Sequence, residues 1–221
     1  MMRYDYREVL KSDRVIFLVI AVMFVAGAWA YPRLPARVPS HWNIKGQIDG
    51  YSGPQWGAFG LPAMSLAMYL AMVFLPLIDP FRTNYARFGG TYRFIRWLLI
   101  AFFAMLHGVI LAAGLGYAPK TGVLVQVAVA LMFILLGNVM GQVKQNWFVG
   151  IKTPWTLADD EVWRKTHRVS AWVWTAAGVL GLLTVFLPAP LNFTLFMALI
   201  LGAALFSMVY SYVLYRSRHL E

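Results

Sequence analysis

Long apolar runs alternate with short polar connections along the whole chain. Six stretches consist almost entirely of hydrophobic residues: Val15 to Ala30, Gly57 to Ile78, Phe94 to Gly116, Gly122 to Val143, Val169 to Leu187 and Leu191 to Tyr215. A helix of about 20 residues crosses the roughly 30 Å hydrocarbon core of a bilayer. The ten-residue alternation of a membrane barrel does not occur, so helices are the structure that pairs the backbone within each run. The pattern therefore predicts an all-α integral membrane protein, a bundle of six transmembrane helices.

The composition supports a lipid environment. Of the 221 residues, 60% are hydrophobic and 13% are charged, and the net charge is +10. In a soluble domain this charge would suggest nucleic acid, but here the basic residues lie in the short connections, as the positive-inside rule expects. With the N-terminus inside, fifteen of the nineteen Lys and Arg residues fall on the inner side. We therefore expect cytoplasmic N- and C-termini, membrane lipids as partners and no direct contact with nucleic acid.

The chain shows no linker or repeat that would divide it, so we expect one membrane domain over residues 1–221. Its first apolar run has an alternative interpretation as a signal peptide, because Ala28-Trp-Ala30 resembles a cleavage site. Tyr31-Pro32 instead looks like an interfacial anchor and helix stop, which favours a first span. Two connections then stand out, an ordered extracytoplasmic loop at 32–56 and a cytoplasmic loop at 137–168.

The extracytoplasmic loop carries an imidazole, an indole, an amide and a carboxylate within nine residues: His41, Trp42, Asn43 and Asp49. Prolines exclude a continuous helix there, and Asn43 to Gly46 and Asp49-Gly50 are typical of turns. We expect Val38, Trp42 and Ile48 to form a small apolar cap over the helix ends. The polar side chains either bond within the turns or contact an outside ligand. A divalent cation would need a further ligand, so neither a metal nor a cofactor is expected.

The cytoplasmic loop is the densest polar passage of the chain. Asn138 and Gln142 lie four residues apart, which predicts one shared face at the end of the fourth span. This face forms either an interhelical hydrogen-bond clasp or part of a polar pocket or permeation path. Gly137 and Gly141 would let another helix approach closely.

Further along, Pro154 ends any helix, and Thr156 with Asp159 predicts the start of a short helix that continues to about His167. With Trp163 on its apolar side, this helix either lies in the headgroup plane or docks a partner. Elsewhere, His107 falls within the third span, where hydrogen bonding between helices is more usual than proton relay. Asp79 follows the second span and should meet the interface. We find no catalytic motif and expect no enzyme.

These residues carry a resemblance to a known family. Gly137-Asn138, Lys144-x-Asn146, Gly150-Ile-Lys-Thr-Pro-Trp-Thr-Leu157 and Val162-Trp-Arg-Lys-Thr-His167 resemble the signature of the SdpI family of bacterial membrane immunity and signalling proteins. The segment from Leu34-Pro to Asp49-Gly50 resembles an uncharacterised extracellular module that often precedes this signature. Lys152 departs from the arginine usual at its position, and Gly141 from a frequent proline.

The resemblance implies a multi-pass protein of the bacterial inner membrane that confers resistance to a secreted antimicrobial peptide toxin. It also implies a second partner, a cytoplasmic winged-helix transcriptional repressor. In that interpretation the outer loop contacts the toxin, and the signature residues relay the signal or line a pocket: Asn138, Gln142, Lys144, Asn146, Lys152, Thr153, Pro154, Trp155, Trp163 and His167. The alternative is a transporter of small molecules or lipids with an intramembrane pocket lined by Asn138, Gln142, Asn146 and His107.

Overall fold

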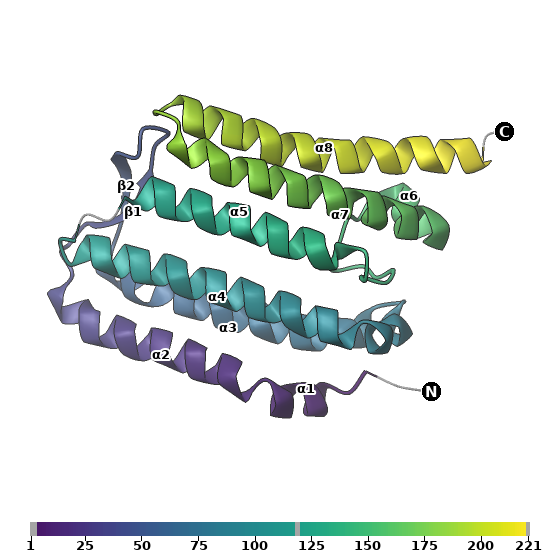
Figure 1. The fold of residues 1–221 in the computed structure, drawn as a ribbon. Coiled ribbons are helices and arrows are strands. Elements are labelled where there is room, and N and C mark those ends of the chain that lie inside the picture. Colours follow the sequence, from purple (N-terminus) through teal and green to yellow (C-terminus); the bar gives the residue numbers. More distant parts are fainter. Residues whose placement is uncertain (1–3, 118–119, 220–221) are drawn as a thin grey trace. The chain divides into compact units, whose positions relative to one another are not determined.

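The structure, a computed structural model, describes residues 4–117 and 120–219 and is almost entirely helical (Figure 1). The long helices are α2 (Arg14–Ala30), α3 (Pro54–Ile78), α4 (Gly89–Gly114), α5 (Thr121–Met140), α7 (Asp160–Leu183) and α8 (Leu191–His219). The shorter elements are α1 (Tyr6–Ser12), α6 (Pro154–Ala158), β1 (Val38–Trp42), β2 (Ile48–Ser52) and the 3-10 turns η1 (Tyr31–Arg33), η2 (Arg82–Arg87) and η3 (Thr184–Phe186).

Six helices are long and apolar enough to cross a membrane, namely α2 continued by η1, α3, α4, α5, α7 continued by η3, and α8. This confirms the predicted all-α, multi-pass membrane protein. Several helix ends differ from the prediction. The third span begins at Gly89, five residues before Phe94, and the fourth ends at Met140 and not near Val143. The fifth helix begins at Asp160, nine residues earlier than Val169. The cytoplasmic location of the termini stays a prediction.

The described residues form two compact units. The hairpin unit comprises residues 6–73, 96–117 and 120–128, and the loop unit comprises residues 4–5, 74–95 and 129–219. The strands belong to the first unit, and the SdpI-like signature belongs to the second. The single membrane domain predicted from sequence stays a prediction.

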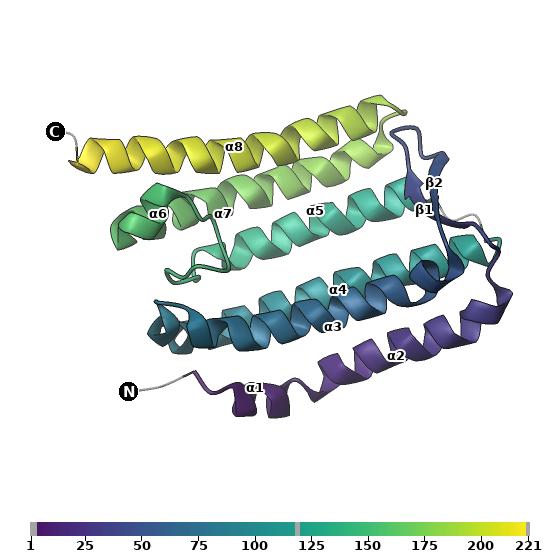
Figure 2. The ribbon, with the colours of Figure 1, turned by 180° about the vertical axis from the view of Figure 1, so that it is seen from behind.

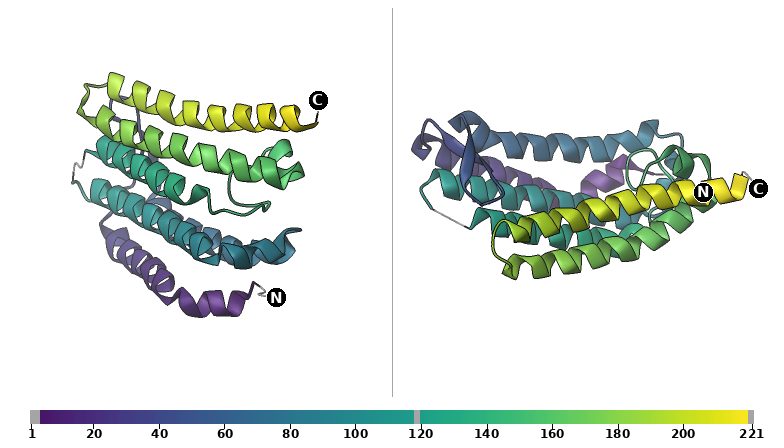
Figure 3. Two further views of the ribbon diagram at one scale, coloured as in Figure 1. Left: turned by 45° about the vertical axis from the view of Figure 1, so that its right-hand side comes forward. Right: turned by 90° about the horizontal axis from the view of Figure 1, so that it is seen from above.

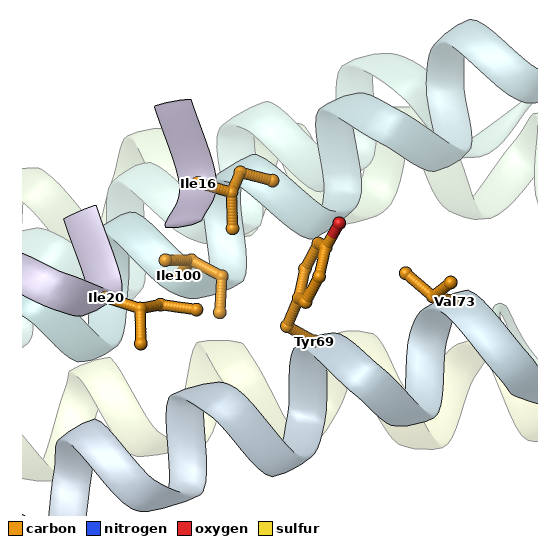
Figure 4. Packing of buried hydrophobic residues seen from close by; sticks show 5 residues of the cluster. All are labelled: Ile16, Ile20, Tyr69, Val73 and Ile100. Carbon is orange, nitrogen blue, oxygen red and sulfur yellow. The ribbon is translucent and has the colours of Figure 1, made fainter. Parts of the chain in front are cut away.

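The core of the hairpin unit lies among α2, α3 and α4. Ile16 and Ile20 of α2 point toward Tyr69 of α3 and Ile100 of α4, and all are buried (Figure 4). Close to this cluster, α1 and α2 meet at Asp13, where Figure 3 shows a break between the two helices. Asp13 and Arg96 are fully buried there, and the Arg96 Nη2 to Asp13 Oδ2 distance is 2.8 Å. Removing either charge would leave the other buried without its partner, at a cost of several kcal/mol.

A second buried contact joins α3 and α4. Pro62 has no backbone N–H, so the carbonyl of Ala58 lacks its usual donor four residues later in α3. His107 of α4 supplies a donor, with Nε2 at 2.9 Å from the Ala58 oxygen. The side chain is 2% exposed. This confirms that His107 bonds between helices, and it explains how a proline is tolerated inside a membrane helix.

The loop unit is built on α5, α7 and α8. Glycines allow α5 and α7 to approach closely, since a Cβ on Gly137 would lie 2.5 Å from Thr175 Oγ1 and one on Gly178 would lie 2.6 Å from the Ala130 oxygen. The helices α7 and α8 run side by side (Figure 2). Trp174 Nε1 donates to Ser207 Oγ at 3.0 Å across this pair. The predicted close approach of a helix at Gly137 is therefore present.

Candidate functional site

The loop at 32–56, which is predicted to be extracytoplasmic, folds into an antiparallel β-hairpin. β1 pairs with β2 from Val38 opposite Ser52 to Trp42 opposite Ile48, and the register shifts on either side of His41. His41 lies opposite Gly50, where a Cβ would come within 2.7 Å of the His41 Cβ. A glycine at this position therefore makes room for the imidazole. The sequence predicted order in this loop but not its strands.

The hairpin brings two of its four predicted ligand residues together. His41 Nδ1 lies 2.6 Å from Asp49 Oδ1, and the two side chains are 71% and 44% exposed. Asn43 is used within the turn instead, because its Oδ1 accepts from the N–H groups of Lys45 and Gln47. Trp42 is half-buried. The described residues hold no cluster of three His, Cys, Asp or Glu side chains that could bind a metal ion.

The predicted apolar cap is smaller than expected. Val38 is fully buried, whereas Ile48 is 42% exposed. Val38 packs against two helix ends, since its Cγ1 lies 2.9 Å from a Cβ placed on Gly57 and 3.2 Å from one on Gly114. One valine and two glycines therefore anchor the base of the hairpin, and the rest of its apolar surface stays open.

The loop at 137–168, still called the cytoplasmic loop after its predicted side, is organised around Asn146, which is fully buried. Its Oδ1 accepts from the N–H groups of Phe148 at 2.9 Å and Val149 at 2.7 Å. Its Nδ2 donates to the carbonyls of Lys144 and Val149, at 2.8 and 2.9 Å. Because both ends of the amide bond to the backbone, this side chain fixes the path of a segment that has no helix or strand of its own.

Asp79 is part of the same network and is buried within the protein, while its position at the depth of the membrane interface stays a prediction. It is 2% exposed and accepts from the N–H groups of Phe81 and Trp147. It also accepts from the hydroxyl of Tyr85 at 2.7 Å. Burial and this bond raise the pKa of Tyr85, so the hydroxyl stays protonated and remains a donor. Sequence reasoning missed Asp79 and Tyr85 as partners of the loop, because their bonds to Trp147 and Asn146 span 68 and 61 positions.

His167 and Gly150 close the far end of the loop. His167 Nδ1 bonds to the carbonyl of Trp163, and Nε2 accepts from the N–H of Ile151, both at 2.9 Å. The ring stacks on Trp163 with 4.1 Å between centroids. Gly150 has a φ of +115°, and a Cβ there would collide with His167 Nε2. Trp163 in turn donates to the carbonyl of Val143 at 2.9 Å. Both ring side chains therefore hold the loop against α7.

The short helix after the loop is not where the sequence placed it. Thr153 caps α6, with Pro154 in its first turn and Thr156 completing the capping box. Asp159 then caps α7 by accepting from Glu161 and Val162. Two adjacent caps thus end one helix and begin the next. As a result, Trp163 and His167 lie on the first turns of a long helix, buried, and not on a separate helix at the membrane surface.

The remaining signature residues are more peripheral. Asn138 is exposed on α5, whereas Gln142 lies beyond the helix end and accepts from Thr91 Oγ1 at 2.7 Å. The two therefore do not share the helix face predicted for them. Lys144 is half-buried, the exposed Lys152 donates to the carbonyl of Phe148 at 3.1 Å, and Trp155 packs on Tyr212.

The arrangement leaves the two polar regions with different chemistry. In the cytoplasmic loop, Asn146, Asp79 and His167 are occupied by backbone or side-chain partners. On the hairpin, the His41 and Asp49 pair is open to contact from outside. An exposed imidazole held by a carboxylate can donate or accept a hydrogen bond from a ligand.

Comparison with known proteins adds the ancestry of the chain. Residues 142–211 match the SdpI/YfhL protein family, and residues 18–66 match a domain of unknown function, DUF1648. The chain is 23% identical over 207 residues to "Immunity protein SdpI" of Bacillus subtilis (strain 168). The aligned residues make up 94% of this chain and 97% of that protein. No solved structure matches the chain. The chain is therefore similar to the SdpI/YfhL family in its signature region and to the Bacillus subtilis immunity protein over nearly its whole length.

Proposed function

We propose that this protein is an SdpI-like immunity protein of the bacterial inner membrane, which protects the cell from a secreted antimicrobial peptide. The observation that carries the proposal is the match to an immunity protein over nearly the full length of both chains. A match that includes the six spans and both connecting regions supports a shared function more strongly than a match of the signature alone. The proposed activity is protection by binding, without catalysis.

Within this function, the hairpin is the proposed contact for the peptide. Its His41 and Asp49 are exposed, whereas the conspicuous polar residues of the cytoplasmic loop are engaged in holding that loop. A rigid cytoplasmic loop with exposed Trp147 and Lys152 would suit a docking partner, and a winged-helix repressor is the partner that we propose for it. No observation favours the transporter, because Asn146 and His107 direct their polar atoms to backbone groups.

Protection can be tested by growth. A strain without the gene, exposed to the peptides secreted by its parent strain, should grow more slowly than the complemented strain. Complementation with a His41→Ala and Asp49→Ala double variant should restore growth poorly while the protein still accumulates in the membrane. Equal growth of the deleted and complemented strains would contradict immunity, and full rescue by the double variant would contradict the hairpin contact alone.

The matched control for the hairpin is Asn43→Asp. The new carboxylate keeps the oxygen that accepts from Lys45 and Gln47, so the turn should persist and protection should remain.

The docking proposal is tested separately. The unaltered protein should capture a repressor in the membrane fraction, and a Trp147→Ala and Lys152→Ala variant should not. Unchanged capture would contradict it.

A further inference from the structure

We infer that the β-hairpin is embedded in the phospholipid headgroup layer, where headgroup phosphates are its partner. The first step is the position of its base. Val38 packs against Gly57, one turn into α3, and against Gly114, the last residue of α4. The base of the hairpin therefore sits at the ends of two spans.

The tip of the hairpin also touches a helix end. The Cα of Gly46, in the turn between the strands, lies 3.7 Å from a Cβ placed on Gly122, the second residue of α5. A five-residue strand is about 17 Å long, so an upright hairpin would hold its tip that far from the helix ends. Contacts at both base and tip instead lay the hairpin across the ends of α3, α4 and α5. Its depth is therefore that of the membrane interface.

The side chains exposed at this depth are apolar or aromatic. Ile44, Ile48 and Tyr51 of the hairpin are between 42% and 49% exposed. Trp29 near the end of α2 and Trp56 at the start of α3 are exposed by 58% and 61%. In water this surface would be unfavourable, whereas indole and phenol rings are stabilised among headgroups, where one edge is apolar and the other wet.

The cations among these rings identify the headgroup chemistry. The Arg33 guanidinium lies 4.5 Å from the ring centroid of Trp29, and that of Arg37 lies 4.4 Å from the ring of Tyr51. Lys45 adds a third cation in the turn, while Asp49 is paired with His41. Guanidinium groups bind phosphate through paired hydrogen bonds. Arg33 already donates from Nη1 to the carbonyl of Trp29, which holds it beside the ring, and its remaining N–H groups can still meet a phosphate. The surface thus fits phosphate and not a hydrocarbon chain alone.

This inference stands independently of the proposed immunity. If both hold, the peptide would meet His41 and Asp49 at headgroup depth and would reach them along the membrane surface. A growth assay tests the immunity, and a depth measurement tests the hairpin, so either can fail without the other.

Spin labels can measure the depth directly, because the chain has no cysteine and single ones can be introduced. Nitroxides at Ile44→Cys and Ile48→Cys would be compared in vesicles of phosphatidylcholine and phosphatidylglycerol. One reference is Val22→Cys, exposed in the apolar middle of α2. The other is Ser217→Cys, exposed in the last turn of α8, a helix of 29 residues that is longer than the hydrocarbon core.

Both hairpin labels should show a ratio of oxygen to soluble nickel-complex collisions between those of the two references. Ratios equal to that of the Ser217 label at both positions would place the hairpin in water and overturn the inference. An Arg33→Gln and Arg37→Gln variant should increase nickel access at the Ile48 label. If it leaves that access unchanged, the phosphate contact is wrong even where the depth is right.

Discussion

Two histidines of this protein lie in connections rich in polar residues, yet one is exposed and the other is buried. His41, on the hairpin, bonds to one carboxylate and is 71% exposed. His167, beside the cytoplasmic loop, bonds to the backbone through both ring nitrogens and is fully buried. A dense polar passage in an oily chain therefore need not be a ligand surface. In the cytoplasmic loop it supplies the hydrogen bonds that a segment without regular structure cannot provide for itself.

The contrast also separates two ways of ordering a loop. The hairpin pairs its own backbone, so its side chains can remain exposed and change with little effect on the fold. Backbone N–H groups of the cytoplasmic loop instead donate to the side chains of Asn146, Asp79 and His167. Replacing any of these side chains would therefore remove a bond that orders the loop. Substitutions should therefore be costly in the loop and mild on the hairpin.

The largest expected effect is at Asn146. Replacing it with alanine leaves the N–H groups of Phe148 and Val149 without their acceptor, and should destabilise the protein by about 3 to 5 kcal/mol. Asn138→Ala, at an exposed position of α5, should change stability by less than about 0.5 kcal/mol. Thermal unfolding in detergent, followed by tryptophan fluorescence, would compare the two. Equal losses of stability in the two variants would contradict the claim that the hydrogen-bonded loop is more sensitive to substitution than an exposed helix position.

The glycines with positive φ offer a second comparison. Gly150→Ala combines backbone strain with a collision against His167, and should cost about 2 to 4 kcal/mol. Gly46→Ala in the hairpin turn meets nothing within 4 Å, so only the strain of about 1 kcal/mol should appear. The same unfolding assay applies. A larger loss at Gly46 would show that the hairpin is the more demanding region.

A third comparison concerns the helices beneath the hairpin. His107→Phe removes the donor to the Ala58 carbonyl and should cost about 1 to 3 kcal/mol, because Pro62 cannot supply a replacement. His107→Gln keeps an N–H donor and should recover part of this loss. Should Phe and Gln be tolerated equally, the bond to Ala58 would not be what holds these helices together.

The smallest effect should be a pH dependence at Asp159, which caps α7. Its partial desolvation would raise the pKa of the carboxyl, but bonds from the N–H groups of Val162 and Glu161 and from Arg218 lower it below the ordinary value near 3.8. A lowered folded-state pKa adds stability that is present above the unfolded-state pKa and is lost as the pH falls through the folded-state one. The gap in melting temperature between the unaltered protein and Asp159→Asn should be present at neutral pH and narrow below about pH 4.

Arg218→Gln provides the control for that gap. It removes the guanidinium that approaches Asp159 Oδ2 at 3.3 Å and leaves the two backbone bonds of the cap. The difference in melting temperature between Arg218→Gln and Arg218→Gln with Asp159→Asn should be smaller at neutral pH than the difference without Arg218→Gln. It should keep the same sign. A gap that widens toward low pH would mean that the carboxylate is not the stabilising form.

Much of the fold follows from the sequence alone. Hydrophobic length determined the six spans, because any segment of that size must bury its backbone bonds internally in lipid. The signature residues also carried the resemblance to the SdpI family. Gly137 and His107 were interpreted correctly, since a glycine on a helix face and a polar ring within a span have few alternatives.

Only the tertiary structure decided the roles of the polar residues. Whether His41 or His167 is exposed depends on what packs around each, and the same residue type with the same local propensity gives both outcomes. The contact of Asp79 with the loop was not predicted because its partner Trp147 is 68 positions away, a pairing that no local pattern encodes. The sequence predicted one helix start at Thr156. The structure instead has two, because Thr153 is the N-cap of α6 and Asp159 is the N-cap of α7. Hydrophobicity acts along the chain and can be read from it, whereas burial and hydrogen-bond partnership arise between distant segments.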